Sequence, residues 1–94
     1  MYKNEMTWRI RVYGIVQGVG FRPTVSRHAT NHGICGTVCN KGPYVEIYAQ
    51  GTKEQIDGFL NSLKEHPPKR AAVLKINTEN ITADTTEHFE HFDI

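Results

Sequence analysis

The sequence predicts an α+β domain in which an antiparallel sheet carries two helices on one face. The first observation behind this prediction is that segments with alternating apolar and polar residues, typical of half-buried strands, recur along the chain. The second is that two segments with apolar residues at helical spacing lie among them. The third is their order: strand, helix, strand, strand, helix, strand and a short final strand. This order is the split β-α-β, or ferredoxin-like, plan.

The size and charge of the chain restrict what it can be. Its 94 residues fit one core, so we expect a single domain over residues 1–94, with a loose lead-in at residues 1–6. The formal net charge of +1 lacks the basic excess of nucleic-acid-binding proteins. No apolar run approaches the roughly 20 residues of a membrane span, and the N-terminus lacks a signal-peptide core. We therefore expect a cytoplasmic protein with neither a nucleic-acid nor a membrane partner.

The first strand is expected at residues 8–13, where Ile10 and Val12 alternate with polar or aromatic residues. It runs into a loop at residues 14–20 that contains three glycines. A helix is expected over residues 21–32, because a proline suits its first turn and a glycine follows its end.

The second and third strands are expected at residues 34–40 and 44–50, joined as a hairpin by a turn at residues 41–43. The second helix is expected to begin after a cap at Thr52 and to run to about Lys64. Its apolar residues form a stripe at helical spacing, which predicts one buried face.

The last third of the chain is less regular. Two prolines precede a fourth strand at residues 72–76, and residues 77–86, rich in Asn and Thr, are expected to form a loop. A fifth strand at residues 89–94 is expected at an edge of the sheet. The expected core is apolar and comprises Ile10, Val12, Phe21, Val25, Ala29, Val38, Val45, Ile47, Ile56, Phe59, Leu60, Leu63, Ile76 and Phe92.

The candidate metal ligands are few. Cys35 and Cys39 on one strand would lie roughly 13 Å apart, too far for a disulfide. One such pair is a weak metal signal, and two small residues that fill space are the favoured interpretation. His28 and His32 have the i, i+4 spacing that could seat a metal, although a solvated helix face is favoured. The sequence thus contains no strong metal motif.

The glycine-rich loop is the best candidate for a functional site. It joins a strand to a helix N-terminus, where unpaired N–H groups and the helix dipole attract phosphate. Glycines let successive N–H groups point inward as an anion nest. Arg22 follows at the helix start, with a planar fork that matches two phosphate oxygens. The loop is not a Walker motif, so on physical grounds a phosphate site and a plain glycine-rich turn are equally good interpretations.

The glycine-rich loop is part of a longer stretch of sequence that resembles a known family. The run from Val16 to Arg22, with Asn40 following at the right distance, resembles the signature of the acylphosphatase family over roughly residues 8–94. Three further features resemble the N-terminal acylphosphatase-like domain of the hydrogenase-maturation carbamoyltransferase HypF. They are the Gly-Phe-Arg-Pro run that begins at Gly20, the Val-Cys-Asn run that ends at Asn40, and Pro67-Pro68.

The resemblance implies hydrolysis of an acyl phosphate, with a carboxyl-phosphate or carbamoyl-phosphate bond, to the acid and inorganic phosphate. It implies that Arg22 binds the phosphate and that Asn40 orients the attacking water. It also implies that no metal, no cofactor and no covalent intermediate takes part, and that further domains of a longer polypeptide are possible partners. The residues expected to bind phosphate are Gln17, Gly18, Val19, Gly20, Phe21 and Arg22.

The chain departs from the family pattern beside Asn40. The family usually has a glycine just before the Val-Glu pair, whereas this chain has Tyr44, preceded by Pro43. A glycine can adopt positive φ where a tyrosine is strained, so the rim of the pocket is expected to differ there.

Three alternatives stay open at this stage. One is a free-standing acylphosphatase. Another is a binding or regulatory domain for acyl phosphates or other anions that has lost turnover through the change at Pro43 and Tyr44. The most distant is a nucleic-acid-binding module on the same fold, which would use an exposed sheet face lined by Arg9, Arg11, Tyr13 and Tyr48.

Overall fold

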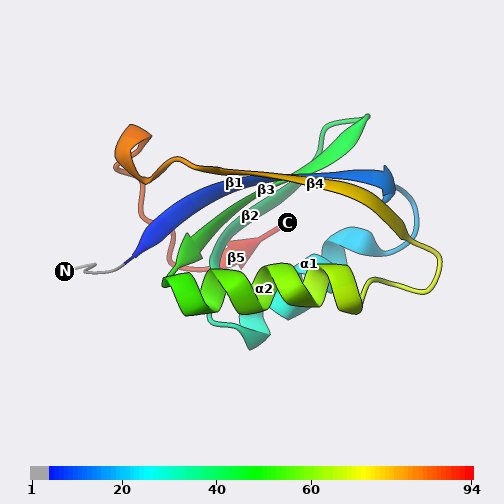
Figure 1. Cartoon of the computed structure of the whole chain (residues 1–94), viewed down its shortest axis with the longest axis horizontal. Coiled ribbons are helices and arrows are strands. Elements are labelled where there is room, and N and C mark those ends of the chain that lie inside the picture. The colour runs from blue at the N-terminus through cyan, green and yellow to red at the C-terminus, as the bar shows by residue number, and fades with distance from the viewer. Residues whose placement is uncertain (1–4) are drawn as a thin grey trace.

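A five-stranded sheet carries both helices on one of its faces in the computed structural model, which describes residues 5–94 (Figure 1). The opposite face, called the open face below, carries neither of these two helices. This arrangement confirms the predicted ferredoxin-like class. The elements in chain order are β1 (Met6–Ile15), α1 (Phe21–Asn31), β2 (Cys35–Asn40), β3 (Tyr44–Gly51), α2 (Lys53–Glu65), β4 (Ala72–Asn80), the 3₁₀ turn η1 (Thr82–Asp84) and β5 (Phe92–Asp93).

The strand order is β4-β1-β3-β2-β5, and every neighbouring pair is antiparallel except the last. β5 runs parallel to β2, with Phe92 opposite Gly36. The prediction of a wholly antiparallel sheet is therefore wrong at this edge. The cause is the path of residues 81–91, which cross the end of the sheet where β2 begins (Figure 1). The chain enters β5 from that end and so runs in the direction of β2.

β4 is longer than the sequence predicts. It continues through Asn80, so the expectation of a loop over residues 77–86 is wrong for the first four of these residues. Residues 77–80 pair with β1, and Glu79 forms an ion pair with Arg9 across the two strands. Pairing with a long neighbouring strand thus overrides the weak strand preference of the Asn and Glu residues in this segment.

β1 begins earlier than the sequence predicts. Met6 already pairs with Gly51 of β3, so the expected lead-in at residues 1–6 is wrong for Met6. Residues 1–4 of that lead-in lie outside the described residues. At the other end of the chain, β5 is confined to two residues rather than the expected residues 89–94.

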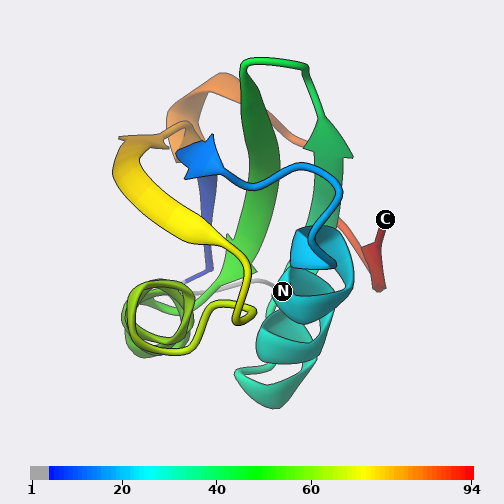
Figure 2. The same cartoon turned by 90° about the vertical axis from the view of Figure 1, so that its right-hand side faces the viewer.

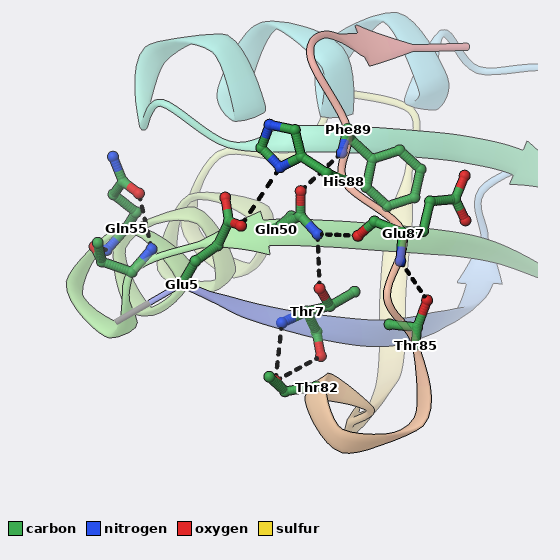
Figure 3. Close-up of polar contacts among 10 residues, drawn as sticks. Glu5, Thr7, Gln50, Gln55, Thr82, Thr85, Glu87, His88 and Phe89 are labelled. Carbon is green, nitrogen blue, oxygen red and sulfur yellow. Dashed lines mark hydrogen bonds and ion pairs between the residues drawn. The ribbon is translucent and has the colours of Figure 1, made fainter. Parts of the chain in front are cut away.

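The buried side chain of Gln50 explains why β5 is short. Its Nε2 donates hydrogen bonds to Thr7 Oγ1 (2.9 Å) and to the carbonyl oxygen of Glu87 (2.8 Å), while its Oε1 accepts one from Phe89 N (2.8 Å) (Figure 3). The backbone of residues 87–89 is therefore bound by an amide side chain and not by a neighbouring strand.

The core lies between the sheet and the two helices. Most of the expected core residues are buried, whereas Leu60, Ile76 and Phe92 are half-buried and pack against the others. Val16 and Ile34, which the prediction omits, are also buried. Cys35 and Cys39 are free thiols, as the spacing argument predicts. Within residues 5–94, no helix combines the length and apolar character that crossing a bilayer requires.

Candidate active site

The loop between β1 and α1 is anchored by its apolar residues. Val16 and Phe21 are each only 2% exposed, and half-buried Val19 packs against the core. The intervening Gly18 and Gly20 are exposed. Figure 2 shows the loop crossing from the end of β1 to the start of α1. Because buried apolar residues alternate with exposed glycines, the loop is anchored to the core and its backbone at the glycines faces solvent.

The two exposed glycines serve the backbone conformation and not the packing. Gly18 and Gly20 have φ of 68° and 73°, in the left-handed region. A Cβ atom built on either would meet nothing within 4 Å. Glycine is therefore required here because other residues are strained at positive φ. Left-handed residues of this kind bend the chain so that successive N–H groups can converge on an anion.

The N-termini of the two helices differ sharply. α2 has a complete capping box, in which the Thr52 side chain accepts from Gln55 N and Gln55 Oε1 accepts from Thr52 N, and it has Glu54 in its first turn. α1 begins after Gly20, with no side-chain cap and no acidic residue in its first turn. The N–H groups and the positive dipole end of α1 thus remain available to an external anion.

Arg22 lies in the first turn of α1 and is exposed. Within residues 5–94, no ion pair involves its guanidinium group. By contrast, Arg9 and Arg11 on the open face are paired with Glu79 and Glu46. Arg22 therefore presents a guanidinium group that is free of acidic partners in this part of the chain, beside an uncapped helix end.

Asn40 ends β2 on the face of the sheet that carries the helices. Side chains alternate along a strand, and Val38 of β2 is buried on the helix side while Cys39 is exposed. Asn40 also lies opposite Val45, a fully buried residue of β3. Its side chain therefore belongs to the same side of the sheet as α1.

One end of the Asn40 side-chain amide already forms a hydrogen bond within the protein. Its Oδ1 accepts a hydrogen bond of 2.7 Å from Gly42 N. Because an N–H group can bond only to the oxygen of an amide, this contact fixes which end of the side chain faces the turn. The Nδ2 group, with its two N–H donors, is left at the other end.

A second contact brings the loop and the Asn40 turn together. Gln17 Nε2 donates a hydrogen bond of 3.2 Å to the carbonyl oxygen of Gly42. Figure 2 shows the hairpin turn extending beyond the loop at the same end of the molecule. The sequence places Gln17 among the phosphate-binding residues, but it gives no sign of this side-chain contact, which joins residues 25 positions apart.

Tyr44 lies in regular strand conformation beside the turn. It is the first residue of β3 and pairs with Tyr13, while the positive φ of the turn, 95°, is taken by Gly42. The rings of Tyr44 and Tyr13 lie 5.2 Å apart, and the guanidinium carbon of Arg11 lies 5.3 Å from the Tyr44 ring centroid. Tyr44 is thus accommodated on the open face, on the opposite side of the sheet from Asn40.

The open face holds a polar surface pocket of about 300 Å³ that is separate from the loop. It is lined by Arg9, Arg11, Asn77, Thr78 and Glu79, none of which belongs to the loop or to the Asn40 turn. Hydrogen bonds with Glu79 and Glu46 raise the pKa of Arg9 and of Arg11, respectively. Nucleic-acid binding on this face would require phosphates to compete with those carboxylates.

The histidines suggested as metal ligands instead join the two helices. His28 Nε2 lies 2.9 Å from the carbonyl oxygen of His66, and His32 Nε2 lies 2.9 Å from Ser62 Oγ. In the part of the chain that the structure describes, no group of three or more His, Cys, Asp or Glu residues could hold a metal ion. These contacts account for both histidines as links between α1 and α2.

Known proteins resemble this chain in sequence and in fold. The acylphosphatase family model matches residues 8–94. The probable carbamoyltransferase HypF of Methanocaldococcus jannaschii is 46% identical over 90 residues, which are 96% of this chain and 12% of that protein. An acylphosphatase of Staphylococcus haemolyticus is 36% identical over 80 residues, covering 83% of this chain and 90% of that protein. The crystal structure of acylphosphatase from Bacillus subtilis superposes with a TM-score of 0.85 at 30% identity, covering 95% of this chain and 97% of that one.

These relatives differ in length, so the chain corresponds to a small part of one and to nearly the whole of the others. The chain spans about an eighth of the HypF relative and most of the length of the two acylphosphatases. The shared region contains the loop, the uncapped start of α1 and the Asn40 turn. The chain therefore belongs to the acylphosphatase family of enzymes.

Proposed function

We propose that this chain hydrolyses acyl phosphates to the acid and inorganic phosphate without a metal, with Arg22 binding the phosphate and Asn40 orienting the attacking water. The observation that carries the proposal is the contrast between the two helix starts. α2 is capped by its own side chains, whereas α1 begins uncapped after left-handed glycines and has Arg22 in its first turn. This arrangement suits a doubly charged phosphoryl group.

In the proposed phosphate-binding step, backbone N–H groups of the loop and of the first turn of α1 hold the phosphoryl oxygens. The Arg22 guanidinium group completes the site. Its charge takes up the negative charge that spreads over these oxygens as the bond to the acyl group lengthens. The leaving group is a carboxylate or carbamate, which departs readily, so no strong general acid is required.

In the proposed hydrolytic step, Asn40 holds a water molecule in line with the breaking bond. Its Oδ1 is committed to Gly42 N, so the Nδ2 group is the part of the amide that is free to bind this water. Oδ1 retains one further lone pair, which can accept a hydrogen bond from the same water, while the water's protons stay with the phosphate product. Positioning of this kind can contribute several kcal/mol to a rate, up to roughly 7–11 in the best intramolecular cases.

The natural substrate is proposed from the relatives. The match to about an eighth of the length of a probable carbamoyltransferase favours carbamoyl phosphate, with this chain acting as the acylphosphatase domain of a hydrogenase-maturation enzyme. The match to free-standing acylphosphatases over most of their own length favours simple carboxyl phosphates. Both substrates have the same phosphoryl group, so one site serves either.

The test is the release of inorganic phosphate from acetyl, benzoyl and carbamoyl phosphate, each with and without an excess of chelator. We expect turnover of at least one substrate, unchanged by the chelator and not raised by magnesium beyond its effect on the substrate itself. Phosphate binding without turnover of any of the three would support the alternative of an anion-binding regulatory domain. A loss of activity on chelation that zinc restores would contradict the metal-free mechanism.

A further inference from the structure

Both backbone polar groups of Gly42 form hydrogen bonds with residues of the proposed site. Its N–H group donates to Asn40 Oδ1 at 2.7 Å, and its carbonyl oxygen accepts from Gln17 Nε2 at 3.2 Å. Its φ of 95° lies where a side chain would be strained, and a Cβ there would meet nothing within 4 Å. The glycine thus serves the turn conformation that presents both backbone groups.

The side chain and the backbone of Gln17 have different interaction partners. The sequence places Gln17 in the phosphate loop, where its backbone N–H group would face the anion. Its side-chain nitrogen, however, donates to the Gly42 carbonyl, and its amide oxygen would repel a phosphate oxygen rather than bind it. The side chain is therefore directed at the turn, and its role differs from that of its backbone.

The hairpin turn has few other fixed points. Lys41, Gly42 and Pro43 are exposed, and the turn is closed by its own hydrogen bond of 2.9 Å from Lys41 N to the Tyr44 carbonyl oxygen. Lys41 adds a long ion pair of 3.9 Å to Glu46 within the same hairpin. Among the hydrogen bonds of residues 5–94, the contact from Gln17 links this turn to the loop that carries the proposed anion site.

We propose that Gln17 is a positioning residue that latches the phosphate loop to the Asn40 turn and so fixes the direction in which the Asn40 amide presents its Nδ2 group. This inference rests on the proposed function for its effect on catalysis. The latch runs through three residues: Gln17 holds Gly42, and Gly42 holds Asn40. Loosening it lets the water-binding group move relative to the bound phosphate while leaving the phosphate-binding groups in place.

The test is the variant Gln17→Met, which keeps a side chain of similar length and removes the donor. We expect kcat to fall by about tenfold or more, because small displacements of a positioning group are costly. We expect KM and the inhibition constant of inorganic phosphate to change less than about twofold, because Arg22 and the loop backbone are untouched. The matched control is Asn61→Met, at an exposed position on α2, which should change none of these values.

Two further measurements make the test decisive. In the double variant Gln17→Met with Asn40→Asp, kcat should be no lower than in Asn40→Asp alone, because both changes disrupt one pathway. Hydrogen exchange at Gly42 N should accelerate in Gln17→Met without any substrate present. That readout tests the latch even if the wild-type chain has no turnover, in which case the proposed function fails on its own.

The outcomes that would overturn the inference are distinct. A raised KM and weakened phosphate inhibition with unchanged kcat would mean that the Gln17 side chain binds the substrate directly. Unchanged kcat together with unchanged exchange at Gly42 N would mean that the contact carries no constraint. A fall in kcat that adds fully to that of Asn40→Asp would mean that Gln17 acts independently of Asn40.

Discussion

In the proposed mechanism the two ends of the Asn40 side chain have different tasks, and one substitution distinguishes them. Asn40→Asp keeps an oxygen to accept from Gly42 N but removes the two N–H donors. We therefore expect an unchanged melting temperature and a fall in kcat of about a hundredfold, with repulsion of phosphate by the new carboxylate as a further penalty. Melting, turnover and phosphate inhibition measured on one sample check this.

Asn40→Ala serves as the comparison, because it removes both ends. It should lose turnover and also about 1 kcal/mol of stability, the usual worth of a hydrogen bond. Phosphate affinity should persist in this variant, since Arg22 is untouched. If Asn40→Asp turned over substrate at nearly the normal rate, the asparagine would be a turn residue only.

Arg22 allows an equally direct test at the level of one residue. In Arg22→Lys the charge remains but the planar fork is lost, so we expect turnover and phosphate inhibition to weaken together by at least tenfold. Arg27→Lys on the same helix is the matched control, because Arg27 is also exposed and bonds only weakly to Thr24, at 3.5 Å. Equal losses in the two variants would count against Arg22 as the phosphate ligand.

At the level of elements, Gly20 and Gly36 both have positive φ, but replacing each by alanine should affect a different property of the protein. Gly20→Ala places its methyl group in open space, so its cost is backbone strain of about 1–2 kcal/mol. Because the loop must then shift, phosphate affinity should fall in a protein that still folds. Gly36→Ala would place Cβ 1.7 Å from the Tyr48 carbonyl oxygen inside the sheet. Its unfolding free energy should drop by more than about 3 kcal/mol.

Thermal melting and phosphate inhibition of these two alanine variants check the contrast. Gly36→Ala with near-normal stability would show that β2 and β3 can separate locally at little cost. Unchanged phosphate affinity in Gly20→Ala would show that the left-handed conformation of Gly20 is not needed for anion binding.

The sequence predicts most elements because their patterns are local. Alternation identifies β1, β2 and β3, and helical spacing identifies α1 and α2. It fails for residues 77–80, whose strand conformation depends on the partner β1, and for the direction of β5, which depends on the path of residues 81–91. Likewise the family signature identifies Arg22 and Asn40 as candidates. The hydrogen bond from Gln17 joins distant residues and leaves no local pattern.

At the level of the whole molecule, Gln50 ties the C-terminal segment across the end of the sheet. Gln50→Leu keeps the volume but leaves Phe89 N and the Glu87 carbonyl oxygen without their partner. We expect a loss of about 2–3 kcal/mol in unfolding free energy, from one hydrogen bond to each group and the cost of leaving them unpaired. Denaturant titration measures this loss.

The same variant distinguishes stability from catalysis. Below its new melting temperature, Gln50→Leu should retain turnover, because Gln50 lies at the end of β3 that is remote from the Asn40 turn. A selective loss of turnover in a fully folded sample would instead connect the C-terminal segment to the active site.

The alternation of β2 has a practical consequence for spectroscopy. Cys39 and Asn40 are adjacent in the chain but belong to opposite faces of the sheet, and Cys39 is exposed. A fluorophore or spin label attached to Cys39, after Cys35→Ser removes the half-buried second thiol, would therefore sit one residue from the proposed water-binding group without entering the phosphate site. Such a label should report on movement of the hairpin turn during turnover while the enzyme remains active.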